Sequence, residues 1–152
     1  MMWVKNVKKI NFKTNAPYEI LIDMNLMRTS GDHIKKFSPA KQVLIITDDI
    51  VNELYSGDLT DSLIGNGFEV FLFVLSHGES SKTLQSVERI YSFLFKNKFT
   101  RSDLIVALGG GIVGDIAGFV AATYMRGIDL VQIPTTLLAQ IDSAIGGKNG
   151  GN

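Results

Sequence analysis

Four short apolar runs, each followed by a segment with helical spacing, are the feature that most constrains the fold of this chain. The runs are QVLIITD at 42–48, FEVFLFVL at 68–75, DLIVAL at 103–108 and DLVQIP at 129–134. Continuous apolar runs rich in β-branched residues are typical of strands that are buried on both faces. Strands that alternate with helices form βαβ units with right-handed crossovers. The sequence therefore predicts an α/β fold with a Rossmann-like, mostly parallel sheet and helices on both faces.

The segments between and after these runs have helical patterns. Helices are expected at 49–55, 58–65, 83–95, about 112–124 and 135–145. In the helix at 83–95, the spacing places five apolar side chains on one face, namely Leu84, Val87, Ile90, Tyr91 and Leu94.

The first 40 residues have a different pattern. VKKINFKT and YEILID are expected to form an N-terminal antiparallel hairpin that turns at Asn15-Ala16-Pro17, followed by a helix around 24–37. We expect one domain over 1–152, of which 146–152 form a loose tail because the last residues, GGKNGGN, are glycine-rich and polar. Such an ending is typical of a chain that has been cut.

Composition excludes several classes of partner. Lys+Arg and Asp+Glu both number 15, so no net charge attracts nucleic acid or an anionic membrane. The chain has no cysteine, which excludes disulfides and thiolate metal sites and suits a cytoplasmic protein. The start, MMWVKNVKKI, lacks the apolar core of a secretory signal. An anionic ligand must therefore be bound by a local arrangement of groups.

The stretch LIVALGGGIVGDIAGF, residues 104–119, joins a strand to a helix through three consecutive glycines. It is not expected to span a membrane, because Asp115 and five glycines interrupt the apolar run. Gly109, Gly111 and Gly114 match G-x-G-x-x-G, a pattern typical of phosphate binding at a helix N-terminus. The alternative is a glycine-rich turn that needs positive φ and close helix packing. The pattern alone leaves both interpretations open.

Two polar clusters follow predicted strands and so fall at the same edge of the sheet. In HGESSK, Glu79 could accept from ribose hydroxyls and Lys82 could meet a phosphate, although a polar loop of this composition is also ordinary. In PTT, Thr135 and Thr136 could cap a helix or bind a phosphate-bearing ligand.

The remaining charged and titratable residues near the glycines are less specific. Asp115 is expected in the first turn of its helix, where it complements the helix dipole or turns aside towards a donor if a dinucleotide binds. Asp142 and Lys148 bracket two glycines, and Lys148 is either an anion contact or an exposed tail charge. His33 and His77 have no second ligand at a metal-binding spacing, so the sequence predicts no metal site.

Taken together, these motifs are more specific than any one of them. GGGIVGDIAGFVAATYMRG at 109–127 and VQIPTTLLAQIDSAIGGK at 131–148 closely resemble the 3-dehydroquinate synthase family, as do GESSK with the helix TLQSVERI, and VLIITDD. The likeness covers about 40–149. Two alternatives stay open: a metal-dependent polyol or alcohol dehydrogenase on the same scaffold, and a non-catalytic nucleotide-binding module.

The resemblance implies an N-terminal NAD-binding α/β domain, a C-terminal helical domain and an active site in the cleft between them. It implies a homodimer, NAD and a zinc or cobalt ion as cofactors, and a sugar phosphate as substrate. The reaction of the family converts 3-deoxy-D-arabino-heptulosonate 7-phosphate to 3-dehydroquinate and phosphate in the shikimate pathway, which makes aromatic amino acids. We expect the helical domain and the metal ligands to be absent from this chain, and the chain by itself to be inactive.

The resemblance also assigns roles to individual residues. Those near the reacting centre are Asp142 and Lys148, together with Arg126, which would reach the substrate of the neighbouring subunit. The implied cofactor contacts are Asp48, Glu79, Lys82, Gly110, Gly111, Ile112, Asp115, Thr135, Thr136 and Leu138. The chain departs from the family pattern at His77, Ile50, Asn149 and Gly151.

Overall fold

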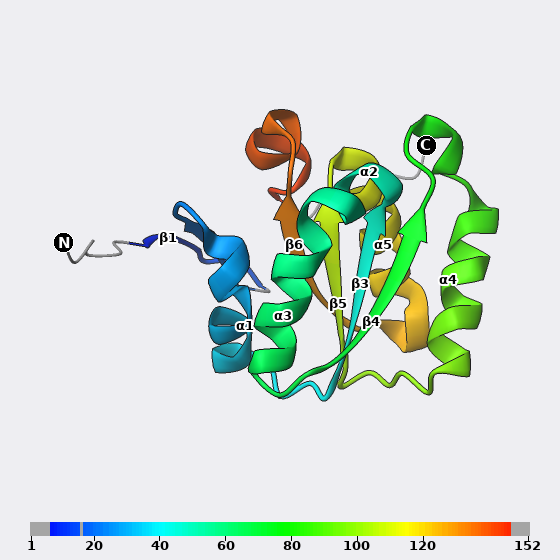
Figure 1. Cartoon of the computed structure of the whole chain (residues 1–152), viewed down its shortest axis with the longest axis horizontal. Helices are drawn as coiled ribbons and strands as arrows, with labels where there is room; N and C mark the ends of the chain where they lie inside the picture. Colours follow the sequence, from blue (N-terminus) through cyan, green and yellow to red (C-terminus); the bar gives the residue numbers. More distant parts are fainter. Residues whose placement is uncertain (1–6, 16, 147–152) are drawn as a thin grey trace.

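The structure, a computed structural model, describes residues 7–15 and 17–146. Its centre is a four-stranded parallel sheet with the strand order β4-β3-β5-β6 (Figure 1). The strands are β3 (Gln42–Asp48), β4 (Glu69–Leu75), β5 (Leu104–Gly109) and β6 (Asp129–Pro134). All four lie within one residue of the predicted runs, so the predicted parallel sheet is confirmed.

Helical segments follow each of the four strands of the parallel sheet, and α1 precedes the first of them. The helical segments are α1 (Leu26–Phe37), α2 (Asp49–Val51), the π-helical turn η1 (Asn52–Ser56), α3 (Gly57–Gly65), the 3₁₀ turn η2 (Glu79–Ser81), α4 (Leu84–Lys96), α5 (Gly111–Thr123), the 3₁₀ turn η3 (Tyr124–Arg126) and the π-helical turn η4 (Ala139–Ser143). Within the described ranges, none of the helices has the length and apolar character needed to cross a bilayer.

Two of the predicted helix boundaries are wrong. The two short helices expected at 49–55 and 58–65 form one continuous helical stretch, because Gly57 has helical dihedral angles (φ −60°, ψ −53°) and does not interrupt it. The helix expected from residue 135 starts after Thr136, because the Thr135 N–H is bonded to the Gly109 carbonyl at 3.0 Å and continues the sheet ladder.

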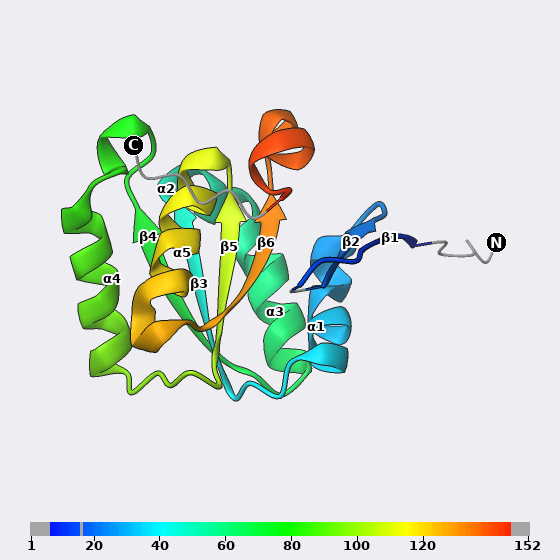
Figure 2. The ribbon, with the colours of Figure 1, turned by 180° about the vertical axis from the view of Figure 1, so that it is seen from behind.

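The helices cover both faces of the sheet, as expected (Figures 1 and 2). On one face, Val43 and Ile45 of β3 pack with α1 and α3. On the other face, Leu44 and Ile46 pack with α4 and α5. Side chains of a strand alternate between faces, so β3 and β5, the two central strands, are apolar at every buried position except Thr47 of β3.

The predicted apolar face of α4 is confirmed for Val87, Ile90 and Leu94, which are buried, and for the half-buried Tyr91. It is wrong for Leu84, whose side chain is 72% exposed. Leu84 is the first residue of the helix, and helical side chains tilt towards the N-terminus, so this one reaches past the end of the packed face.

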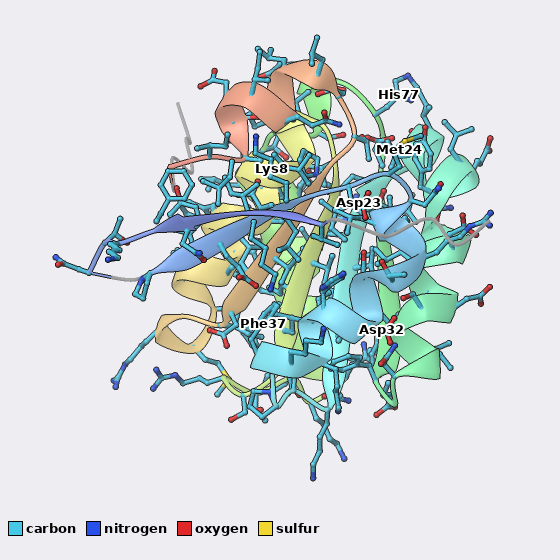
Figure 3. All side chains as sticks on the ribbon, turned by 90° about the vertical axis from the view of Figure 1, so that its left-hand side faces the viewer. Lys8, Asp23, Met24, Asp32, Phe37 and His77 are labelled. Atoms are coloured by element: carbon cyan, nitrogen blue, oxygen red, sulfur yellow. The ribbon has the colours of Figure 1, made fainter. Side chains whose placement is uncertain are left out.

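The predicted N-terminal hairpin is also present. Strands β1 (Lys8–Phe12) and β2 (Tyr18–Ile22) pair antiparallel, and Figure 3 shows the hairpin crossing in front of the sheet. The rings of Phe12 and Tyr18 stack with centroids 4.8 Å apart. The Tyr18 hydroxyl accepts a hydrogen bond from the Gly146 N–H at 3.3 Å, which joins the hairpin to the end of the described chain.

The order of connections creates a crevice at one end of the sheet. After β3 the chain passes to the face that carries α3, whereas after β5 it passes to the face that carries α5. Because β3 and β5 are neighbours, the loops at their carboxyl ends separate in opposite directions. In open α/β sheets this switch point is where ligands bind.

Candidate functional site

A hollow of about 330 Å³ lies at this switch point. It is bounded by the segments that follow β3, β4, β5 and β6, so all four strands contribute to it. The residues that line it are Asp48, Ile50, Val51, Leu75, Ser76, His77, Gly78, Gly110, Gly111, Ile112, Val113 and Thr136. Five of the predicted cofactor contacts are therefore brought together: Asp48, Gly110, Gly111, Ile112 and Thr136.

The glycines between β5 and α5 serve two purposes. None of Gly109, Gly110 and Gly111 has positive φ, so the alternative of a turn that needs it is wrong. Close packing does require Gly109, because an added Cβ would lie 2.7 Å from Cγ2 of the buried Val113. The other two are less restricted: a Cβ on Gly110 would lie 3.2 Å from Thr136 Cγ2, and one on Gly111 would lie 3.3 Å from Ser143 Oγ.

The start of α5 offers unpaired donors to the hollow. The helix begins at Gly111, and no side chain caps it. The first intrahelical bond at this end runs from the Gly114 N–H to the Gly110 carbonyl at 3.1 Å. The N–H groups before Gly114 have no partner within the helix, and the helix dipole is positive at this end. Such an end binds an anionic group without any basic side chain.

Asp115 is not in the first turn of α5, contrary to the prediction, because the helix starts one residue earlier than expected. Its carboxylate reaches the β4 side of the site, where Oδ2 lies 2.9 Å from Lys82 Nζ. The hydrogen bond to Asp115 is the largest influence on the pKa of Lys82, which is raised above its ordinary value; partial burial opposes the rise, and the charges of Asp115 and Glu79 add to it. The pair joins the loop after β4 to α5 and leaves Lys82 protonated.

Asp48 and Asp49 have different partners. Asp48 Oδ1 accepts a hydrogen bond from the Val51 N–H at 2.9 Å and so caps α2. Asp49 instead reaches the loop after β4: its Oδ1 lies 2.9 Å from Nδ1 of His77 and accepts the His77 backbone N–H at 3.0 Å. Desolvation raises the pKa of Asp49, but the hydrogen bonds and charge of His77 outweigh it and hold the pKa below its ordinary value.

The Asp49–His77 pair was not predicted from the sequence. The two residues are 28 positions apart, and a local spacing rule does not detect such a contact. The only available signal was their place after neighbouring parallel strands, since Asp48 is in register with Leu75. Carboxyl ends of paired strands lie side by side, which brings the residues that follow them into contact.

The segment after β6 contributes less to the hollow. Thr136 Oγ1 accepts the Ala139 N–H at 3.1 Å, which is the capping interaction that the sequence allowed. Leu138 is 68% exposed, and Asp142 is also exposed. Neither residue lines the hollow, and nor do Glu79, Lys82, Asp115 or Thr135.

Arg126 lies far from the hollow. It follows the last turn of α5, and 13 helical residues separate the two ends by about 20 Å. Met125 and Arg126 both adopt left-handed backbone conformations, with φ of 48° and 68°. The arginine side chain is exposed at the amino end of the sheet. Lys148 lies outside the described residues.

Across residues 7–15 and 17–146, no group of three or more His, Asp or Glu side chains is arranged to hold a metal ion.

Comparison with known proteins identifies the family. A family model described as the N-terminal part of 3-dehydroquinate synthase matches residues 72–152. The 3-dehydroquinate synthase of Streptococcus thermophilus (strain CNRZ 1066) is 51% identical over 144 residues, which are 95% of this chain and 40% of that protein. This chain belongs to the 3-dehydroquinate synthase family. It spans about 40% of the length of the curated relatives that it matches.

Solved structures of similar fold agree with this membership in the 3-dehydroquinate synthase family. A 2-deoxy-scyllo-inosose synthase complexed with carbaglucose-6-phosphate, NAD⁺ and Co²⁺ has a TM-score of 0.79 at 27% identity, over 91% of this chain and 37% of that one. The 2-epi-5-epi-valiolone synthase of Streptomyces hygroscopicus subsp. jinggangensis 5008, with NAD⁺ and Zn²⁺ bound, has a TM-score of 0.72 at 30% identity, over 93% of this chain and 40% of that one.

Proposed function

We propose that this chain, over residues 1–152, is the NAD-binding domain of a 3-dehydroquinate synthase, a phosphate-eliminating lyase. The whole enzyme would convert 3-deoxy-D-arabino-heptulosonate 7-phosphate to 3-dehydroquinate and phosphate. The observation that carries the proposal is the uncapped start of α5, where Gly110 and Gly111 leave N–H groups open to a hollow at the switch point. A diphosphate fits this arrangement because its charge is matched by the helix end.

The proposal gives each part of the site a task. The N–H groups at Gly111 and Ile112 would hold the diphosphate, and the ends of β3 and β4 would hold the nucleoside. Lys82 and Asp115 would fix each other and so hold the loop after β4 against α5. NAD, when bound, supplies a reversible hydride acceptor for a ring hydroxyl of the substrate.

The residues near the reacting centre belong to the same proposal. Asp142 would act from the segment after β6, at the carboxyl end of the sheet, and Lys148 is proposed to act together with it. Arg126 would contact the substrate of a second subunit, because it lies about 20 Å from the hollow of its own chain. The enzyme would therefore work as a homodimer. Its cytoplasmic location is a prediction from the cysteine-free composition.

A zinc or cobalt ion is proposed for the whole enzyme only. The described residues of this chain hold no group of three candidate ligands, so the ligands of that ion would lie outside the described residues. We expect the 152-residue chain with added NAD and Zn²⁺ to release no phosphate from the substrate, because the chain spans only 40% of its relatives' length. Formation of 3-dehydroquinate by the purified chain would contradict this expectation.

Isothermal titration calorimetry of the chain with NAD tests the central proposal. We expect saturable binding with one site per chain, and competition by ADP, which carries the diphosphate and one nucleoside. Absence of heat up to millimolar NAD would contradict the proposal. In the whole enzyme, release of phosphate without net NADH supports the synthase, whereas net NADH from a polyol supports the dehydrogenase alternative.

A further inference from the structure

The charged side chains of this protein are distributed unevenly between the two ends of the sheet. Six exposed cations lie in the last turns of α1 and α4 and in the loops that precede β3 and β5, namely Lys35, Lys36, Lys41, Lys96, Lys98 and Arg101. We call these six residues the basic surface. Their segments meet at the amino end of the sheet, opposite the hollow (Figure 1). In Figure 3, nitrogen-tipped side chains extend from the end that carries Phe37, away from His77. The net charge of zero therefore does not describe this end of the molecule.

Hydrogen bonds join the loops of the basic surface into one connected unit. The Gln42 backbone N–H donates to Asp103 Oδ1 at 3.1 Å, and the Gln42 side-chain Nε2 donates to the Asn97 carbonyl at 3.3 Å. The Glu69 N–H donates to the Lys41 carbonyl at 2.9 Å. The loops before β3, β4 and β5 are therefore held side by side, together with the cations that they carry.

The nearby carboxylates leave the basic surface largely unneutralised. Among the described residues, none of the ion pairs includes any of the six cations. Asp103 is only 6% exposed, and its oxygens accept hydrogen bonds from Gln42 and Thr100. Glu69 and Asp129 are exposed, but they begin the two outer strands, β4 and β6, at the flanks of this end.

Helix dipoles explain only part of this positive charge. The three lysines in the last turns of α1 and α4 complement the negative ends of these helices. The three cations in the loops before β3 and β5 have no such role. Asp32 lies four residues before Lys36 on α1, yet the two side chains form no ion pair. The surplus of positive charge points to an anionic partner.

Two exposed phenylalanines accompany the cations. Phe37 is 57% exposed and follows Lys36, and Phe95 is 81% exposed and precedes Lys96. Aromatic rings next to lysines are typical of proteins that lie on a membrane, because the rings enter the headgroup region while the ammonium groups meet lipid phosphates. The two rings come from helices on opposite faces of the sheet, so a broad anionic surface meets both at once (Figures 1 and 2). A nucleic-acid strand stacks successive bases on neighbouring rings, and two rings separated by the sheet do not offer that arrangement.

We propose that the basic surface, together with Phe37 and Phe95, binds the surface of an anionic phospholipid membrane. This inference is independent of the proposed function. In the bound orientation, the hollow at the carboxyl end of the sheet faces away from the lipid and remains open to a nucleotide. The aspartates at that end, Asp48, Asp49 and Asp115, are kept away from the anionic lipid as well.

Co-sedimentation of the chain with vesicles tests the inference. We expect binding to vesicles of phosphatidylserine and phosphatidylcholine, no binding to vesicles of phosphatidylcholine alone, and release at about 0.5 M NaCl, where charges are screened. The double variant Lys96→Glu/Lys98→Glu should bind about tenfold or more weakly, because each cation near the lipid contributes to the attraction. The matched control is Lys8→Glu/Lys13→Glu in the N-terminal hairpin, which changes the net charge equally and should bind within about twofold of wild type.

Phe95→Ser separates the apolar contribution from the electrostatic one. It should weaken binding about threefold to tenfold and leave the salt dependence unchanged, because the ring contributes apolar contact and no charge. Failure of the wild-type chain to bind the phosphatidylserine vesicles at low salt, or equal losses in the two double variants, would overturn the inference. Tighter binding to a fluorescent single-stranded oligonucleotide than to the vesicles would also overturn it. Thermal unfolding verifies that each variant is folded.

Discussion

Glycines occupy two regions of this molecule for opposite reasons. Gly31 lies where α1 crosses α3, and an added Cβ would lie 2.1 Å from the backbone oxygen of Ser62. Gly110 lies before α5, has dihedral angles open to any residue (φ −79°, ψ −166°), and would place a Cβ 3.2 Å from the side chain of Thr136. Packing forbids a side chain at Gly31, but neither packing nor backbone conformation forbids one at Gly110.

The difference separates structural glycines from those that keep a surface open. A glycine whose added Cβ would collide with closely packed atoms is explained by the fold. A glycine that could be alanine, on the wall of a hollow and beside an uncapped helix start, is explained by a ligand that approaches the main chain. Gly109 belongs to the first kind although it adjoins Gly110 in the sequence, because a Cβ there would collide with Val113.

The largest effect is expected for Gly31→Ala. The new methyl group would push α1 away from α3, and we expect a loss of roughly 2–4 kcal/mol in the free energy of unfolding. Urea denaturation measures it. Gly57→Ala is the matched control: this helical glycine has nothing within 4 Å of an added Cβ, so the same substitution should stabilise the protein by about 0.5–1 kcal/mol. Equal effects at the two positions would contradict the conclusion that close packing excludes a side chain at Gly31.

Gly109→Ala should have the second largest effect on stability. Its methyl group would lie 2.7 Å from a buried valine side chain, which must move or rotate, and we expect a loss of about 1–3 kcal/mol in the free energy of unfolding. If urea denaturation instead shows wild-type stability, the assignment of Gly109 to the structural kind is wrong.

Gly110→Ala should weaken NAD binding more than it weakens the fold. We expect the free energy of unfolding to change by less than about 1 kcal/mol, because Thr136 can yield by a few tenths of an ångström. NAD affinity should fall about tenfold or more, since the methyl group occupies the approach to the N–H groups at the start of α5. On the same sample, urea denaturation tests the expected stability and calorimetry tests the expected NAD affinity. Wild-type affinity would contradict the ligand-based explanation of this glycine.

The smallest effect on stability is expected for Lys82→Met. The pair with Asp115 raises the pKa of Lys82 above the ordinary 10.5, so its stabilising contribution is present below pH 10.5 and is lost as the pH rises through the folded-state value. The difference in thermal midpoint between wild type and variant should stay constant from about pH 6 to about pH 9 and vanish at higher pH. Lys41→Met, at an exposed lysine with no ion pair among the described residues, should show no such dependence.

The fold was largely predictable because its strands are apolar on both faces and short loops separate them from helices. The helical boundaries at 57 and 135 were not predictable, because Gly57 remains helical and Thr135 is held by Gly109 of a neighbouring strand. The partner of Asp115 was also not predictable, since Lys82 is 33 positions away and the two side chains meet only when β4 and α5 are in place.

The sequence by itself determined the parallel sheet, the helices on both faces, the hairpin and the family. Those features depend on hydrophobic periodicity and on local motifs, and both are formed by residues that are close together in the sequence. Only the tertiary structure decided which glycine is free to take a side chain and which aspartate orients a histidine. These depend on distances between segments far apart in the chain, and such distances exist only after the strands have paired and the helices have packed.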